Sequence, residues 1–294
     1  MGLKIENVTK TFIDKKAVDD ISFEISKPGV FALLGTNGAG KTTTIRMMLG
    51  IIKKDTGNIT WNGKAVDRKS VNFGYLPEER GLYPKSKIVD QLMYFAKLKG
   101  MKKADAEKNI DYWLERLKMT EYKNSLAEKL SKGNQQKIQF IIAVMHNPDL
   151  VVLDEPFSGL DPVNTDLLKD VILELVEKGK YIVMSSHQMN SVEEFCDDIV
   201  ILSRGKTVLK GNLNEIKSVY PKNKLEIDTK EDITKVIDNL KVKEHNRNKY
   251  IIQIENEKQA EEILETLVAK KVKVEKYEIL KPTLHEIFIE KVGE

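Results

Sequence analysis

The sequence predicts an α/β protein built on a parallel β-sheet and followed by a smaller α+β domain. Short apolar runs typical of buried strands recur between helical stretches through roughly the first two-thirds of the chain. A glycine-rich loop joins one of these runs directly to a helix. Beyond residues 211–221 the pattern changes to several strands interspersed with three helices. These observations indicate a strand–helix core and a separate second domain.

The first domain is expected to begin with two antiparallel strands at residues 3–8 and 17–25, because apolar and polar residues alternate there. Further strands are expected at residues 30–34, 57–61, 71–75, 150–153, 181–185 and 199–202. Helices are expected at 41–49, within 87–117, between the strands at 150–153 and 181–185, and before the strand at 199–202. Strands that alternate with helices predict a parallel core.

The second domain is predicted to span residues 216–294, which leaves 1–215 for the first. Its strands are expected near 225–227, 241–244, 250–254 and 272–279. Helices are expected at 232–240, at 258–269 and after Pro282. The order βαββαβ predicts a small ferredoxin-like domain.

Composition narrows the class of protein. The 294 residues are 41% hydrophobic and 32% charged, which is typical of a globular chain with enough apolar residues for a core. The net charge of +3 is close to balance, so no nucleic-acid partner is expected. The single cysteine, Cys196, excludes an intrachain disulfide and fits a reducing compartment. No apolar run approaches the ~20 residues of a membrane span, and the start has no signal-peptide pattern. We therefore expect a cytoplasmic chain.

A phosphate-binding loop is the strongest local signal. Residues 35–42 read GTNGAGKT and fit the pattern G-x-x-x-x-G-K-S/T between a strand and a helix. Glycines let the backbone wrap phosphate oxygens, and the helix start adds partial positive charge. Lys41 is expected to reach the β- and γ-phosphates, and the Thr42 hydroxyl to bind Mg²⁺. The predicted nucleotide site comprises Gly35, Thr36, Asn37, Gly38, Ala39, Gly40, Lys41, Thr42 and Thr43.

Two carboxylates follow a second apolar strand, LVVLDE at residues 150–155. Asp154 ends the strand, where it can hold the hydration shell of Mg²⁺. Glu155 is next and can polarise a water towards the γ-phosphate. Most Asp-Glu pairs are solvated turns, but the apolar strand in front favours a catalytic pair here.

With these motifs in place, the sequence resembles one family, the ABC (ATP-binding cassette) ATPases. LSKGNQQK at residues 130–137 resembles the family signature LSGGQ, and SGLD at 158–161 resembles its D-loop. His187, after a strand in the sequence SSH, resembles its switch histidine. Phe12 lies where the family stacks an aromatic ring on adenine. The motifs occur in family order over residues 1 to about 211.

The resemblance implies a P-loop NTPase core with antiparallel β and helical subdomains. In the family two such domains pair head to tail, and the signature of one closes over the γ-phosphate held by the other. It therefore implies ATP and Mg²⁺ as cofactors, with Glu155 and His187 as catalytic residues. The residues expected to contact nucleotide across the pair are Ser131, Lys132, Gly133, Asn134, Gln135 and Asp161. Ser131 opens a helix, and an exposed helix start is a ready anion site.

Three positions depart from the family pattern. Lys132 and Asn134 differ from the signature, while Gln135 keeps its final residue. Glu78, in GYLPEER, replaces the Q-loop glutamine, and a carboxylate there can ligate Mg²⁺ directly or through water. Thr42 replaces the commoner serine and preserves the hydroxyl. Of the other histidines, His146, His245 and His285 are expected at the surface or in packing.

The stretch GYLPEERGLYPK and the ending PTLHEIFIEKV resemble one branch of the family, the ATPase subunits of bacterial sodium, drug or antimicrobial-peptide exporters. The resemblance implies a homo- or heterodimer on the inner face of the cell membrane, powering a separate transmembrane permease, for export. The permease is expected to dock near Glu78 to Tyr83, although Leu82 and Tyr83 could equally anchor that loop to the helices.

The sequence leaves two alternative functions to compare with this one. One alternative is a soluble ABC ATPase acting on ribosomes or nucleic acid. Such proteins usually carry two cassettes or a long coiled coil, and this sequence has one phosphate loop and no heptad tract of that length. The other is a binding module with inactive catalysis, which the presence of both Glu155 and His187 argues against.

Overall fold

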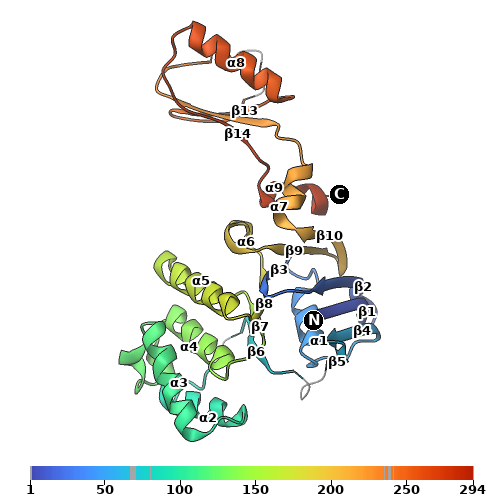
Figure 1. Ribbon diagram of the computed structural model, residues 1–294, viewed down its shortest axis with the longest axis vertical. Coiled ribbons are helices and arrows are strands. Elements are labelled where there is room, and N and C mark those ends of the chain that lie inside the picture. Colours follow the sequence, from blue (N-terminus) through green and yellow to red (C-terminus); the bar gives the residue numbers. More distant parts are fainter. Residues whose placement is uncertain are drawn as a thin grey trace. The chain divides into compact units, whose positions relative to one another are not determined.

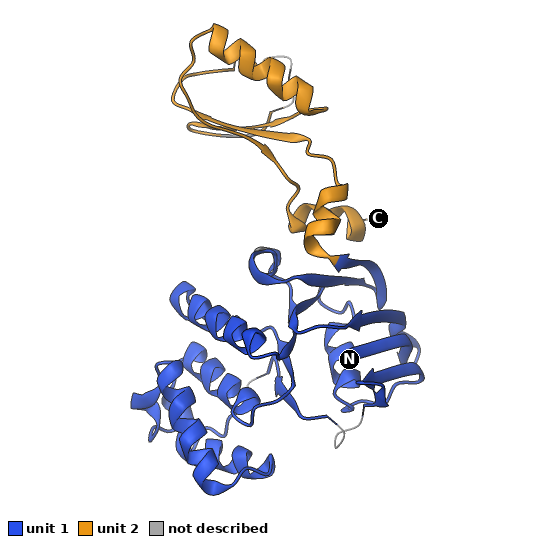
Figure 2. Cartoon of the chain, in the orientation of Figure 1, with its two compact units in different colours: residues 1–211 blue, residues 212–294 orange. Residues whose placement is uncertain are grey.

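The computed structural model describes residues 2–66, 71–79, 81–234, 236–237, 240 and 242–293 (Figure 1). The chain forms two compact units, residues 1–211 and 212–294 (Figure 2). Helix α7 (Leu213–Val219) follows the division and is capped by Asn212, whose side chain accepts the N–H groups of Asn214 and Glu215. The domain limits 1–215 and 216–294 stay a prediction.

Unit 1 begins with a four-stranded antiparallel sheet in the order β2-β1-β4-β5. Its strands are β1 (Leu3–Phe12), β2 (Lys15–Ile25), β4 (Thr56–Trp61) and β5 (Lys64–Ala65). The inward side chains of this sheet, such as Ile5 and Ile21, are buried. The predicted antiparallel start is confirmed, and β5 is a short edge strand that the sequence pattern did not indicate.

A six-stranded sheet in the order β10-β9-β3-β8-β7-β6 forms the centre of unit 1. Its strands are β3 (Gly29–Gly35), β6 (Phe73–Leu76), β7 (Leu150–Asp154), β8 (Tyr181–Ser186), β9 (Asp198–Ser203) and β10 (Lys206–Asn212). The pairs β6–β7, β7–β8, β3–β8 and β3–β9 are parallel. Because β3 and β7 are buried along their whole length, they are continuous apolar runs in the sequence.

The last two strands of unit 1, β9 and β10, form a hairpin, which the sequence pattern did not predict. β9 and β10 are joined by Arg204 and Gly205, with φ angles of 47° and 80°. Positive φ at both positions is typical of a tight two-residue hairpin turn. The apolar pattern weakens along β10 because that strand lies at the sheet edge.

Helices connect the parallel strands, as predicted (Figure 1). α1 follows β3, α4 precedes β7, and α5 and α6 separate β7, β8 and β9. The expected helical stretch within 87–117 is two helices, broken by Gly100 at a φ of 78°. The helices of unit 1 are α1 (Lys41–Met48), α2 (Ile88–Leu98), α3 (Lys103–Arg116), α4 (Lys132–Val144), α5 (Pro162–Glu177) and α6 (Met189–Phe195). None of the helices within the described ranges is long and apolar enough to span a membrane.

Unit 2 is an antiparallel sheet in the order β12-β13-β11-β14 with its own core. Its elements are β11 (Lys224–Thr229), β12 (Val242–Asn246), β13 (Lys249–Gln253), α8 (Glu257–Ala269), β14 (Val274–Leu280) and α9 (Leu284–Gly293), besides α7. The buried side chains alternate along β13, where Tyr250 and Ile252 face the core. The predicted helix at 232–240 lies partly outside the described residues, while Ile237 N–H donates to Ile233 O at 3.1 Å, a helical spacing.

His146, in the loop between α4 and β7, is a packing residue, as expected. Its Nε2 lies 3.1 Å from the Phe73 carbonyl oxygen, and its Nδ1 is buried without a hydrogen-bond partner among the described residues. Because a carbonyl only accepts, Nε2 must carry the hydrogen of the neutral ring. Burial, together with the nearby Lys99 ammonium, lowers the pKa of His146 to about 4.

This depressed pKa predicts a loss of stability in acid. Between pH 6.5 and about 4 the unfolded chain binds a proton at His146 and the folded chain does not. The free energy of unfolding should therefore fall as the pH falls through that window, by about 1–2 kcal/mol for this partly exposed site at pH 5. Urea unfolding at pH 7.5 and pH 5 measures it. His146→Gln keeps a donor for the Phe73 carbonyl but does not titrate, so its free energy of unfolding should fall less between pH 7.5 and pH 5 than that of the wild type. Equal losses in both proteins would contradict the assignment.

Candidate functional site

The phosphate-binding loop connects the end of β3 to the start of α1. Its tight path depends on Gly40, which has a φ of 105° and lies against the neighbouring β2. A Cβ atom there would lie 2.5 Å from the Ala17 carbonyl oxygen, which no side chain could tolerate. α1 begins at once with Lys41, so its first N–H groups lie in the loop. The sequence-predicted loop therefore has the shape of an anion-binding cradle.

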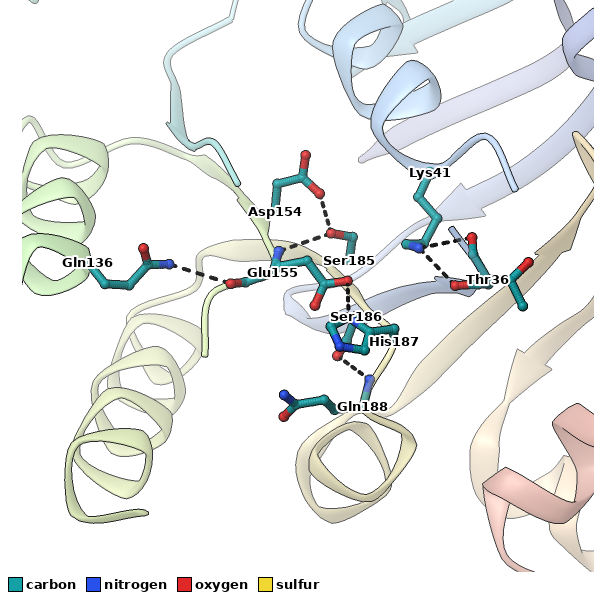
Figure 3. Close-up of polar contacts among 10 residues, drawn as sticks. Thr36, Lys41, Gln136, Asp154, Glu155, Ser185, Ser186, His187 and Gln188 are labelled. Atoms are coloured by element: carbon teal, nitrogen blue, oxygen red, sulfur yellow. Dashed lines mark hydrogen bonds and ion pairs between the residues drawn. The ribbon is translucent and has the colours of Figure 1, made fainter. Parts of the chain in front are cut away.

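Lys41 is buried beside this loop. Its Nζ donates to the carbonyl oxygens of Gly35 at 2.8 Å and Thr36 at 3.3 Å (Figure 3). An ammonium has three donors, so one further hydrogen remains for a ligand. Thr42 and Thr43 follow in the first turn of α1 and are half-buried.

Asp154 ends β7 in a buried position. Its Oδ1 accepts a hydrogen bond from the Ser185 hydroxyl on β8. Its Oδ2 is buried and has no hydrogen-bond partner among the described residues. A buried carboxylate oxygen without a partner needs a cation or ordered water, and oxygen ligands suit Mg²⁺. The residues present therefore fit a magnesium ion at the end of β7.

Glu155 and His187 form a pair at the same edge of the sheet. His187 Nδ1 lies 2.8 Å from Glu155 Oε1, and the Glu155 side chain is 9% exposed where that of His187 is 57% exposed. The Glu155 N–H donates to Ser185 Oγ at 3.1 Å. Ser185 thus links Asp154 to Glu155 through one hydroxyl, as Figure 3 shows.

The electrostatic environment of Glu155 suits a base. Burial raises the pKa of the Glu155 carboxyl, whereas His187 and Lys41 lower it in part. A carboxylate is a better proton acceptor when its pKa lies closer to neutrality. The pair can therefore orient a water and take up its proton.

The signature segment begins helix α4. Ser131 caps the helix, and its Oγ accepts the Asn134 N–H at 3.2 Å. Lys132 is exposed, and Gly133 and Asn134 are half-buried, all in the first turn. The Gln135 side chain folds back instead, and its Nε2 donates to the carbonyl oxygens of Ala127 at 3.1 Å and Leu130 at 3.3 Å. Gln135 therefore holds the turn before the helix.

The remaining predicted residues lie at the surface. Phe12 ends β1 with an exposed ring, 5.3 Å from the Lys10 ammonium. Asp161 caps α5 and accepts the Asn164 N–H at 2.9 Å. Glu78 is exposed after β6. The structure gathers Lys41, Asp154, Glu155 and His187 at the carboxyl ends of neighbouring parallel strands, and the contacts of the described residues do not join Phe12, Glu78 or Asp161 to them (Figure 3).

Sequence reasoning missed two polar residues of this site. Ser185 precedes His187 by two positions at the end of β8, and a polar residue that ends a buried strand was the available signal. Gln136 lies inside the signature string, and its Nε2 donates to the carbonyl oxygens of Glu155 at 3.5 Å and Pro156 at 3.1 Å. Spacing along the chain does not reveal that contact.

Comparison with known proteins identifies the family. The chain is 50% identical to the uncharacterized ABC transporter ATP-binding protein YhaQ of Bacillus subtilis, over 99% of this chain and 98% of the relative. It belongs to the ABC transporter ATP-binding proteins. The sequence model of the ABC transporter family matches residues 18–158, and that of the DrrA1-3-like ATP-binding protein C-terminal domain matches residues 211–292. The linearmycin resistance ATP-binding protein LnrL of B. subtilis is 34% identical over 74% of this chain and 71% of its own length.

Solved structures agree with this assignment. The ATP-binding subunit of an ABC transporter matches with a TM-score of 0.69 and 30% identity, over 74% of this chain and 92% of that one. CbiO1 of Clostridium perfringens, part of the ABC transporter complex CbiONQ, matches with a TM-score of 0.64 and 25% identity, over 74% and 90%. The predicted fold class is confirmed.

Proposed function

We propose that this ABC protein hydrolyses ATP to ADP and phosphate with Mg²⁺ and so powers a separate membrane permease, for export. The observation that carries the proposal is the linked group of Asp154, Ser185, Glu155 and His187 at the end of β7 and β8. The Asp154 oxygen without a hydrogen-bond partner among the described residues can bind a cation, and Glu155 paired with His187 can act as a general base. The similarity to a drug-resistance ATP-binding protein supports the export direction.

The nucleotide is bound by the loop and the residues around it. Loop N–H groups from Gly35 to Thr43 and the Lys41 ammonium hold the β- and γ-phosphates. The Thr42 hydroxyl and Asp154 hold Mg²⁺, with Glu78 reaching it directly or through water. Bound Mg²⁺ neutralises charge on the phosphates. Phe12 stacks on adenine, for which its exposed ring is suited.

Glu155 and His187 perform the proton chemistry. Glu155 accepts the proton of the attacking water while its backbone is held by Ser185. His187 donates from Nδ1 to the Glu155 carboxylate, which fixes that side chain, and its exposed ring can turn towards the γ-phosphate.

A second nucleotide-binding domain completes each site, in a homodimer or a heterodimer. The start of α4, with Ser131, Lys132, Gly133 and Asn134, is an exposed helix N-terminus that closes over the partner's γ-phosphate. Asp161 lies beside it at the start of α5 and takes part in the same contact. The Lys132 ammonium adds positive charge at that surface.

The permease docks on the surface around Tyr83 and α2. The Tyr83 backbone is held by Gln91, which accepts its N–H at 2.8 Å and donates to its carbonyl at 3.0 Å. Its ring is 53% exposed and packs on Tyr94 and Phe95, with centroids 6.5 Å away in both cases. A cavity of about 470 Å³, lined by Met93, Tyr94, Lys97 and Met101 among others, continues this apolar surface along α2. A rigid aromatic surface that joins the segment after Glu78 suits a cytoplasmic segment of the permease.

Replacing Tyr83 tests both parts of the proposal. The wild-type chain should release phosphate from ATP only with Mg²⁺, and the full complex should transport. Tyr83→Ala should keep at least about half of the ATPase activity of the isolated chain, while transport falls on the order of tenfold because an aromatic anchor is lost. Tyr112→Ala is a matched control, since Tyr112 is a similarly exposed tyrosine on α3 that packs on Trp113. Transport that survives, with only a lower melting temperature, would mean that Tyr83 is structural.

A further inference from the structure

A buried side chain of α4 contacts the catalytic segment of the same chain. Gln136 is 2% exposed, and its Nε2 donates to the carbonyl oxygens of Glu155 and Pro156 (Figure 3). The Nε2 amide has two hydrogens, so it can serve both acceptors. Gln136 lies on the second turn of α4, the helix that Ser131 caps. One side chain thus joins the signature helix to the backbone of Glu155.

The backbone of Glu155 depends on such contacts. Glu155 has a φ of 51°, in the left-handed region that residues with a Cβ atom adopt at a cost. Ser185 accepts its N–H at 3.1 Å, and Ser158 N–H donates to its carbonyl at 3.1 Å. Gln136 adds the hydrogen bonds that come from α4. The direction of the Glu155 side chain follows from this constrained backbone.

α4 also contacts the rest of the segment from Glu155 to Asp161. A Cβ atom at Gly133 would lie 3.2 Å from the Gly159 carbonyl oxygen, so the helix start packs closely on the segment. Lys137 is buried, and its Nζ donates to Asn164 Oδ1 at 3.0 Å. Asn164 Nδ2 in turn lies 2.6 Å from Asp161 Oδ2. α4 therefore holds the segment at both ends. Gln136 holds the end at Glu155, and Lys137 holds the end at Asp161 through Asn164.

We propose that Gln136 is a positioning residue for hydrolysis, which sets the orientation of Glu155 according to the position of α4. When the start of α4 contacts the nucleotide of the partner domain, the resulting position of α4 would set the orientation of Glu155 in the same chain. This inference rests on the proposed function, in which Glu155 polarises the attacking water. It assigns to Gln136 a role in turnover that is separate from nucleotide binding.

Gln136→Met tests the proposal, because methionine keeps the length of the side chain and removes the donor. In the purified full-length chain we expect kcat to fall on the order of tenfold to a hundredfold, as a shift of the base by a fraction of an ångström would cause. KM and the Kd of a fluorescent ATP analogue should stay within about twofold, since the phosphate loop is untouched. If the methionine variant does not fold, Gln136→Asn replaces it. Asparagine keeps the amide, but its shorter side chain cannot reach the carbonyl oxygens of Glu155 and Pro156, so kcat should again fall.

Asn109→Leu is the matched control at the other end of the helix. Asn109 lies on α3, and its Nδ2 donates to the carbonyl oxygen of Met145 at the end of α4 at 3.1 Å, so it too is a side-chain amide that ties α4 to a neighbouring segment. Its loss should lower the melting temperature and leave kcat unchanged. A kcat for Gln136→Met that matches this control, or a fall in kcat together with lost ATP binding, overturns the inference.

Glu155→Gln separates this inference from the proposed function. If Glu155→Gln is inactive and Gln136→Met has lost kcat with ATP binding intact, the positioning role is supported. If Glu155→Gln is inactive and Gln136→Met turns over normally, the positioning role fails and the proposed function stands. If Glu155→Gln turns over at the wild-type rate, both fail.

Discussion

Glu155→Gln is expected to bind ATP normally and to hydrolyse it roughly a hundredfold to ten-thousandfold more slowly than the wild type. Glutamine has the shape of glutamate but cannot accept the proton of the attacking water. Because the phosphate loop and Asp154 are unchanged, the variant should accumulate as an ATP-bound dimer. Phosphate release measures the rate, and size-exclusion chromatography with ATP and Mg²⁺ measures the dimer.

Asp149→Asn is a suitable control for this variant. Asp149 precedes β7 at the opposite end from Asp154, and it is 3.8 Å from the Lys180 ammonium at an exposed position. Removing that carboxylate should leave turnover intact, because Asp149 lies at the end of β7 away from Asp154 and Glu155. Wild-type turnover by Glu155→Gln would mean that another group positions the water.

If Glu155 is the base, its raised pKa should make the rate of ATP hydrolysis depend on pH. The base must be ionised, and burial raises the pKa of this carboxyl. Turnover of the wild type should therefore decline on acidification at a higher pH than for an exposed glutamate, as its base form is lost.

Lys41→Ala is expected to weaken ATP binding by roughly tenfold to a hundredfold, since a charge-assisted hydrogen bond to phosphate contributes about 1.5–3 kcal/mol. The loss has a second source in the loop itself. Lys41 Nζ donates to the Gly35 and Thr36 carbonyl oxygens, and without it these acceptors no longer help to shape the loop. Titration with a fluorescent ATP analogue measures the affinity.

Lys53→Ala controls for a general loss of positive charge. Lys53 is exposed beyond the end of α1, on the same helix–loop unit but away from the phosphates. Its removal should leave the affinity within about twofold of the wild type, because an exposed charge at that distance is largely screened. Unchanged affinity in Lys41→Ala would contradict the assignment of the phosphate loop.

The local elements could be predicted because their signals lie within a few residues. GTNGAGKT combines glycines that allow tight turns with a lysine at the start of a helix, and the chain forms that loop between β3 and α1. The run at 150–154 is apolar because β7 is buried along its length between β6 and β8. Where the local signal was weak, prediction failed, as at the edge strand β10. Edge strands contact less of the core, so their sequences are less apolar.

The sequence by itself indicated the glycine-rich loop, the two carboxylates after an apolar strand, the histidine after another strand, and the succession of strands along the second domain, since each depends on residues close together in the chain. Only the tertiary structure decided which side chains meet. Ser185 and Glu155 are 30 residues apart and share a hydrogen bond because β7 and β8 are paired in parallel register. Gln136 reaches Glu155 because α4 packs beside the end of β7. Such contacts depend on how distant elements pack against one another, and spacing within one stretch of sequence carries no information about that packing.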